Sequence, residues 1–200
     1  MKIVVVNNYK EPSQTDKAVL NIEKSTAQSV EKIDYQEPDL HSKVAEFGAD
    51  LVILTGSSAL LSKPRTRELF QPEMDLVRKA TFPILGICYG HQIIGSAFNA
   101  PMRDLGQMFR GYEKVSVVKT HPLFDGLPSD LVVAESHRQE LTRVPDEFQH
   151  LAQSTTSRVE AIAHRTKPIY GVQFHPERSN DDHPHGRVIL RNLLKHIRGF

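Results

Sequence analysis

Short apolar runs alternate with amphipathic stretches through the first half of the chain, and this order predicts an α/β fold. The apolar runs are uninterrupted by charge, which is typical of strands buried on both faces of a sheet. The expected strands cover residues 2–6, 29–36, 50–55 and 84–87, and the expected helices lie within residues 15–24, 38–47, 66–80 and 91–98. We therefore predict a mostly parallel, doubly wound sheet with helices on both faces.

The second half of the chain has a different pattern, with several short β-like segments in succession. These segments cover residues 112–119, 131–135, 150–154, 158–163 and 169–174. We expect them to form additional antiparallel strands that continue the sheet or make a small companion layer. A last helix is expected over residues 187–197, where four apolar residues recur at helical spacing and face the core. The whole chain, residues 1–200, is predicted to be a single domain.

Composition narrows the range of functions. The chain has 25 Lys and Arg residues against 24 Asp and Glu residues, so charge provides no footprint for nucleic acid or for an acidic membrane, and a small-molecule ligand fits better. A single cysteine excludes an internal disulfide bond. We see neither an export signal nor an apolar run of the roughly 20 residues needed to cross a bilayer, so we expect a cytoplasmic protein.

The single cysteine, Cys88, lies in the sequence Pro-Ile-Leu-Gly-Ile-Cys-Tyr-Gly-His-Gln, between an expected strand and an expected helix. Gly86 and Gly90 flank it at two residues on either side, and this spacing is typical of the tight turn that exposes a nucleophile above a sheet. A thiol at a helix N-terminus is also favoured as the reactive thiolate. The alternative interpretation is that Cys88 is a small buried hydrophobic residue.

A second motif, His-Pro-Glu at residues 175–177, follows the last expected strand. Proline biases the residue before it towards an extended backbone, and side chains two apart in an extended chain point to the same side. His175 and Glu177 are therefore expected to share a face, as a base and the acid that orients it do.

Together the two motifs closely resemble those of the class I, or triad, glutamine amidotransferases. The resemblance extends over most of the chain, and within the family it is strongest to the stand-alone glutaminase subunit of GMP synthetase, with the glutaminases of anthranilate and aminodeoxychorismate synthase next. The segments that carry it are residues 83–92, 123–128, 135–137, 144–148 and 169–177.

The resemblance implies a catalytic triad of Cys88, His175 and Glu177. It implies an oxyanion hole built from the backbone amides of Tyr89 and of Gly56 or Ser57. It further implies that the Gln92 side chain and the backbone of Ser136 and His137 contact glutamine. Relatives usually have Gly-Gly-Pro where this chain has Gly-Ser-Ser at residues 56–58.

The predicted activity is hydrolysis of glutamine through a γ-glutamyl thioester, with delivery of ammonia to a separate ATP-dependent synthetase, the ATP-pyrophosphatase subunit of GMP synthetase being the first choice. The chain lacks a Gly-x-x-x-x-Gly-Lys-Ser/Thr loop, which places nucleotide activation on another polypeptide. Neither a cofactor nor a metal is expected, and we interpret Asn180–His185 as a solvated loop or a partner contact. Two alternatives stay open: a weakly active or non-catalytic glutamine-binding regulatory subunit, and an amidase acting on other γ-glutamyl compounds.

Overall fold

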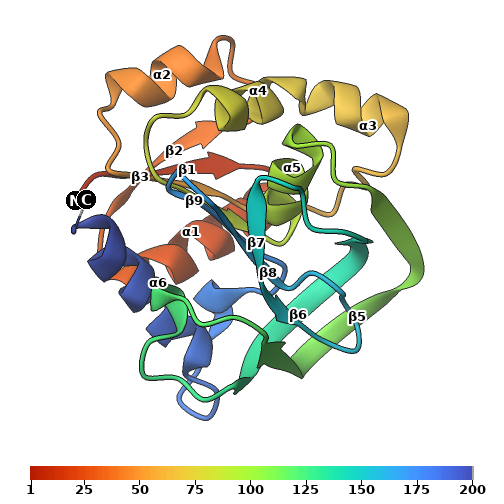
Figure 1. Ribbon diagram of the computed structural model, residues 1–200. Helices are drawn as coiled ribbons and strands as arrows, with labels where there is room; N and C mark the ends of the chain where they lie inside the picture. Colours follow the sequence, from red (N-terminus) through yellow and green to blue (C-terminus); the bar gives the residue numbers. More distant parts are fainter. Residues whose placement is uncertain (200) are drawn as a thin grey trace.

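The computed structural model describes residues 1–199, in which nine strands form one mixed sheet (Figure 1). The strands follow the order β2-β1-β3-β4-β9-β8-β7-β5-β6 across the sheet. They are β1 (Ile3–Asn7), β2 (Val30–Asp34), β3 (Leu51–Leu54), β4 (Ile84–Ile87), β5 (Met102–Val117), β6 (Asp130–Leu141), β7 (Phe148–Gln153), β8 (Ala161–His164) and β9 (Ile169–Val172). The helices are α1 (Pro12–Thr26), α2 (Leu40–Glu46), α3 (Pro64–Leu69), α4 (Gln71–Lys79), α5 (Tyr89–Ala97) and α6 (His185–Ile197), with short 3-10 turns η1 (Pro122–Phe124) and η2 (Pro176–Arg178).

The parallel half of the sheet confirms the predicted α/β fold. Strands β2, β1, β3, β4 and β9 pair in parallel, and their apolar side chains pack on both faces. Helices α1 and α6 cover one face, while α2, α4 and α5 cover the other, as Figure 1 shows. Because parallel strands end at the same edge, the turns after β3, β4 and β9 lie next to one another at that edge.

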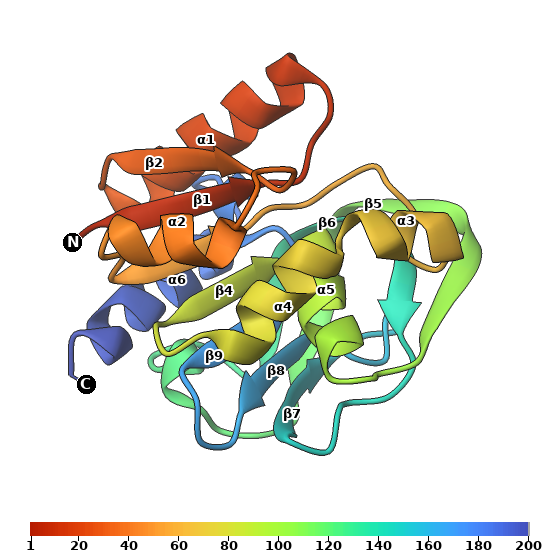
Figure 2. The same ribbon diagram turned by 90° about the horizontal axis from the view of Figure 1, so that it is seen from above.

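The antiparallel half is larger than the sequence predicts. Strands β5 and β6 form a long ribbon over 16 and 12 residues, well beyond the expected segments 112–119 and 131–135. Much of β5 is exposed, so its polar residues hide the apolar alternation from which a strand is recognised. The ribbon extends to one side of the parallel strands in Figure 2.

Two predicted helices also differ in the structure. The stretch 66–80 holds two helices, α3 and α4, that meet at Phe70, because Pro72 provides no backbone N–H at the start of α4. Phe70 is buried there against the Tyr35 and Tyr89 rings, with ring centroids 4.2 and 4.9 Å away. Helix α2 begins at Leu40 rather than at Pro38, after Asp39 adopts a left-handed backbone.

Strand β6 is the last in the sheet order, yet it returns to the carboxyl ends of the central strands. The backbone N–H of His175, which follows β9, donates to the Ala134 carbonyl of β6 at 2.8 Å. The sheet thus curls, and its edge strand passes over the turn that carries Cys88. Across residues 1–199, every helix is too short or too polar to cross a bilayer.

Candidate active site

Cys88 occupies a strained corner between β4 and α5. Its φ of 53° and ψ of −98° lie in a region that non-glycine residues rarely adopt, and such strain is stored at functional sites. The flanking glycines make the corner possible. A Cβ atom on Gly86 would lie 2.5 Å from the backbone of Gly90, and one on Gly90 would lie 2.4 Å from the Leu54 carbonyl oxygen. The tight turn predicted from the Gly-x-Cys-x-Gly spacing is therefore confirmed.

His175 and Glu177 form a buried pair at the end of the neighbouring strand. Strands β4 and β9 pair with Ile87 opposite Val172, which places Cys88 and His175 at the same edge. His175 Nδ1 donates to Glu177 Oε1 at 2.8 Å, and both side chains are about 95% buried or more. Burial alone opposes a charge on Glu177, but the contacts with His175 and Arg178 prevail and lower the pKa of its carboxyl group.

Cys88 and His175 lie on the same stretch of β6 without contacting each other directly. The thiol donates to the Ser136 carbonyl at 3.5 Å and accepts from Gln173 Nε2 at 3.6 Å, and within residues 1–199 no hydrogen bond joins it to His175. Catalytic contacts are often loose before substrate binds. The geometry is that of a resting thiol beside an oriented imidazole.

The expected ease of thiolate formation is not found. Burial raises the pKa of the Cys88 thiol to about 12, and the negative charge of Glu135 raises it further, against the smaller opposing effects of Arg178 and the Tyr89 backbone. Desolvation thus outweighs the favourable helix N-terminus. A base has to remove the thiol proton during attack.

The loop after β3 is fixed by a network that sequence patterns did not indicate. Asn8 Nδ2 donates both to the Thr55 carbonyl and to Glu73 Oε1, each at 3.0 Å, and the Gly90 amide donates to that same carbonyl at 3.1 Å. Asn8 and Glu73 are fully buried, and burial raises the pKa of Glu73 to about 8. This network ties the loop to the start of α5.

Gly56 and Ser57 differ in what their positions require. A Cβ atom on Gly56 would lie 2.5 Å from the Tyr9 hydroxyl and 3.0 Å from His175 Cε1, so only glycine fits there. Ser57 is not among the non-glycine residues with positive φ in residues 1–199. A second glycine is therefore not needed for backbone conformation at position 57.

The predicted substrate-contacting residues surround a small inner chamber of about 40 Å³. Its wall includes Cys88, Tyr89, Gln92, Ser136 and His137. Gln92 Nε2 donates to the Gln139 carbonyl and to Gln173 Oε1, at 2.9 and 3.0 Å. Gln173 in turn contacts the thiol, so Gln92 orients a residue that sequence analysis missed. Its position two residues before His175, on the same side of an extended strand, was the available signal.

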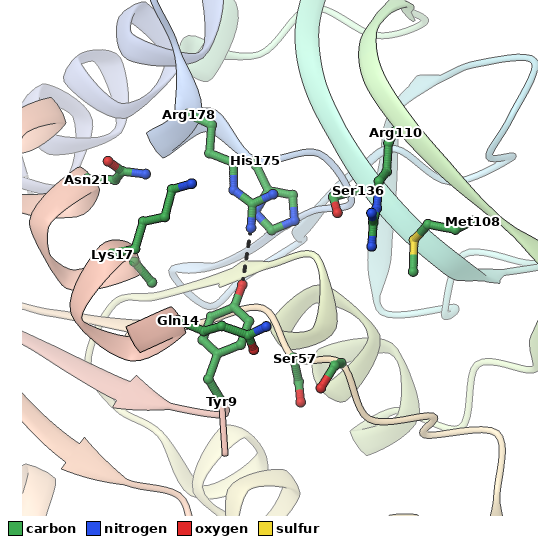
Figure 3. Close-up of a pocket in the computed structure, with 12 residues that line it drawn as sticks. Tyr9, Gln14, Lys17, Asn21, Ser57, Met108, Arg110, Ser136, His175 and Arg178 are labelled. Carbon is green, nitrogen blue, oxygen red and sulfur yellow. Dashed lines mark hydrogen bonds between the residues drawn. The ribbon is translucent and has the colours of Figure 1, made fainter. Parts of the chain in front are cut away.

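A larger outer chamber of about 270 Å³ lies on the other side of His175 (Figure 3). Lys17, Arg110 and Arg178 bring positive charge to it, and no carboxylate occurs among the described residues that line it. The two chambers share Ser57, Ser58, Met108 and Ser136. An uncharged leaving group such as ammonia can depart through it, and an anion would be attracted to it.

Tyr9 is a second site residue that sequence analysis did not indicate. Arg178 Nη2 donates to the Tyr9 hydroxyl at 3.3 Å, the contact drawn as a dashed line in Figure 3. Burial, and then the nearby Cys88 charge, raise the pKa of Tyr9. With its oxygen accepting from Arg178, the hydroxyl proton is available to point into the outer chamber beside His175.

Comparison with known proteins agrees with this geometry. The family model "Glutamine amidotransferase class-I" matches residues 4–197. The glutamine-hydrolyzing subunit of a GMP synthase from Methanocaldococcus jannaschii is 41% identical over 122 residues, which are 61% of this chain and 64% of that relative. The equivalent protein from Thermoplasma acidophilum is 42% identical over 113 residues, 56% of each chain. The matched regions thus span less than two thirds of these curated relatives.

Solved structures share the whole fold. The crystal structure of a T. acidophilum protein, described as one of the subunits of a GMP synthase, superposes with a TM-score of 0.83 at 29% identity, covering 100% of this chain and 94% of that one. A glutamine amidotransferase from Thermotoga maritima superposes with a TM-score of 0.78 at 17% identity, covering 98% and 97%. With its thiol, imidazole and carboxylate at one edge of this sheet, the chain belongs to the class I glutamine amidotransferases.

Proposed function

We propose that this protein is a glutaminase that uses Cys88, His175 and Glu177 as a triad. The observation that carries the proposal is the buried His175–Glu177 pair, joined at 2.8 Å, beside a cysteine held in a strained strand-to-helix corner. The carboxylate keeps the proton on Nδ1, which leaves Nε2 free to accept the thiol proton. An orienting acid behind a histidine has no purpose unless the imidazole moves protons.

The reaction begins when Cys88 Sγ attacks the side-chain amide carbon of glutamine. His175 takes the thiol proton and gives it to the departing ammonia, which leaves a γ-glutamyl thioester on the sulfur. His175 then activates a water molecule that hydrolyses the thioester and releases glutamate. Because the pKa of the resting thiol is about 12, transfer of its proton to His175 accompanies the attack.

Backbone amides are proposed to stabilise the tetrahedral intermediates. The amide of Tyr89, directly after the nucleophile, supplies one donor, and the amide of Gly56 or Ser57 supplies the other. The fixed Thr55 carbonyl supports this role, since it links the loop to the corner through Asn8 and Gly90. The inner chamber receives glutamine, with Gln92, Ser136 and His137 in its wall.

The ammonia is proposed to serve a separate ATP-dependent synthetase in purine biosynthesis, the ATP-pyrophosphatase subunit of GMP synthetase, which aminates xanthosine monophosphate. The names of the curated relatives support this acceptor. The cytoplasm is the corresponding location. Anthranilate and aminodeoxychorismate synthases are the alternative recipients.

Cys88→Ala tests the proposal. The variant should lose glutamine-dependent product formation with the partner synthetase while ammonia-dependent synthesis continues at the same rate. Unchanged glutamine turnover would contradict the assignment of the nucleophile. A regulatory glutamine-binding protein would instead bind glutamine, and react with a glutamine-like electrophile at Cys88, without steady release of glutamate.

A further inference from the structure

A buried cluster of three potential metal ligands lies at β6, next to the residues that contact the thiol. Glu135 and His137 are two apart on β6 and share a face, and Glu160 immediately precedes β8. They are 3%, 2% and 0% exposed. One nitrogen or oxygen atom from each lies within 4.8 Å of the other two.

The polar atoms of this cluster lack partners. Within residues 1–199, both carboxylate oxygens of Glu135, both ring nitrogens of His137 and Oε2 of Glu160 make no hydrogen bond. Buried polar groups are normally satisfied, and each exception requires an explanation. Five unsatisfied atoms in one cluster indicate a species that binds among them.

The spacing of two of these atoms fits ligands of a common cation. His137 Nε2 lies 3.5 Å from Glu135 Oε2, which is longer than the roughly 2.7–2.9 Å of a charge-assisted hydrogen bond. Two ligands of a tetrahedral cation with bonds of about 2.1 Å are about 3.4 Å apart. The pair therefore has the separation of metal ligands.

Surrounding contacts hold the ligands in place. Ser154 Oγ donates to Glu160 Oε1 at 2.6 Å, which leaves Oε2 directed elsewhere. The Glu160 backbone is fixed on both sides, its N–H by Ala152 and its carbonyl by Gln173. The His137 ring stacks on Phe109. Such supporting contacts orient the ligands of metal sites.

The local charge also calls for a cation. Within residues 1–199, no ion pair to lysine or arginine reaches Glu135 or Glu160, and the nearby Glu140 is already tied to Arg103 and to the Arg158 amide. Burial lowers the pKa of His137, so its neutral ring is available as a ligand and does not compensate the carboxylates.

We propose that Glu135, His137 and Glu160 bind one divalent first-row transition cation. Zinc suits an imidazole with two carboxylates, and it is held more tightly than manganese by nitrogen and oxygen sites in general. The cation is structural and does not touch substrate. It braces β6 where the Ala134 and Ser136 carbonyls hold His175 and Cys88, and it neutralises the Glu135 charge that faces the thiol.

The test measures zinc binding in a Cys88→Ala background, where the thiolate cannot act as a ligand. Chelator-treated full-length protein is titrated with zinc by calorimetry in the presence of a competing chelator. We expect one equivalent to bind, and Glu135→Gln or Glu160→Gln to weaken its affinity at least tenfold. Glu113→Gln is the matched control, because this neighbouring carboxylate on β5 contributes charge without being a ligand, and it should change affinity less than threefold. Equal affinity in Glu135→Gln and its parent would overturn the proposal.

Two further measurements separate the proposal from its rivals. Zinc should raise the melting temperature of the parent, and Glu135→Gln should abolish that rise while the metal-free variant melts no lower than its metal-free parent. If the two acids merely share a proton, zinc will have no effect on either melting temperature, and the proposal is wrong. Cobalt in the otherwise wild-type protein should give tetrahedral visible bands without a thiolate charge-transfer band. Because none of these readouts requires glutamine turnover, they are independent of the proposed function.

Discussion

Replacing His175 with alanine should expose how far the thiol depends on its base. With a pKa of about 12, the fraction of Cys88 ionised at pH 7.5 is about 10 to the power −4.5, since each pH unit changes the ratio tenfold. His175→Ala leaves only this spontaneous thiolate. We therefore expect kcat for glutamine hydrolysis to fall by about 10⁴-fold, at the upper end of what general base catalysis contributes.

The assay is glutamate release, measured by a coupled dehydrogenase, between pH 7 and pH 9.5. The residual rate of His175→Ala should rise close to tenfold per pH unit, whereas the wild-type rate should level off. Cys88 is the only cysteine in the chain, so its alkylation by iodoacetamide, followed by mass spectrometry, reports the thiolate fraction directly. A variant within tenfold of wild type, or one with a flat pH profile, would refute the reasoning.

Three further changes test other parts of the site. Tyr9→Phe keeps the ring but loses the acceptor for Arg178, and we expect kcat to fall about three- to tenfold with little change in unfolding free energy, as checked by kinetics and urea denaturation. In Glu73, the folded-state pKa of about 8 lies above the ordinary 4.5, so the folded state keeps a proton that the unfolded state loses, and wild-type stability should decline as pH rises from about 4.5 to 8; Glu73→Gln should remove this decline, of order a few kcal/mol. Gly90→Ala places a Cβ atom 2.4 Å from the Leu54 carbonyl and should lower stability by about 2 kcal/mol or more, seen as a reduced melting temperature; a wild-type melting temperature would show that the corner relaxes without cost.

The parallel core was predictable because its signals are local. Uninterrupted runs such as residues 51–54 have no alternative to burial, and the glycines around Cys88 leave little choice of turn. The His175–Glu177 pairing followed from a proline and a period of two. These features depend on neighbours in sequence, which a pattern can represent.

What sequence analysis missed depends on contacts between distant segments. Asn8, Glu73 and Thr55 come from three separate elements, and nothing near Glu73 indicates that helix packing buries it completely. Tyr9 reaches Arg178 across 169 positions of the chain. The high thiol pKa likewise arises from desolvation in the folded protein, whereas the sequence displayed only the helix N-terminus that opposes it.

The curl of the sheet has a mechanical consequence. A single strand, β6, touches the sulfur through Ser136 and the imidazole segment through Ala134, and its other neighbour is the largely exposed β5. A protein that grips the outside of this ribbon therefore has leverage on the distance between nucleophile and base without approaching either one. Shifting one hairpin by a fraction of an ångström would be enough to tune the enzyme between idle and engaged.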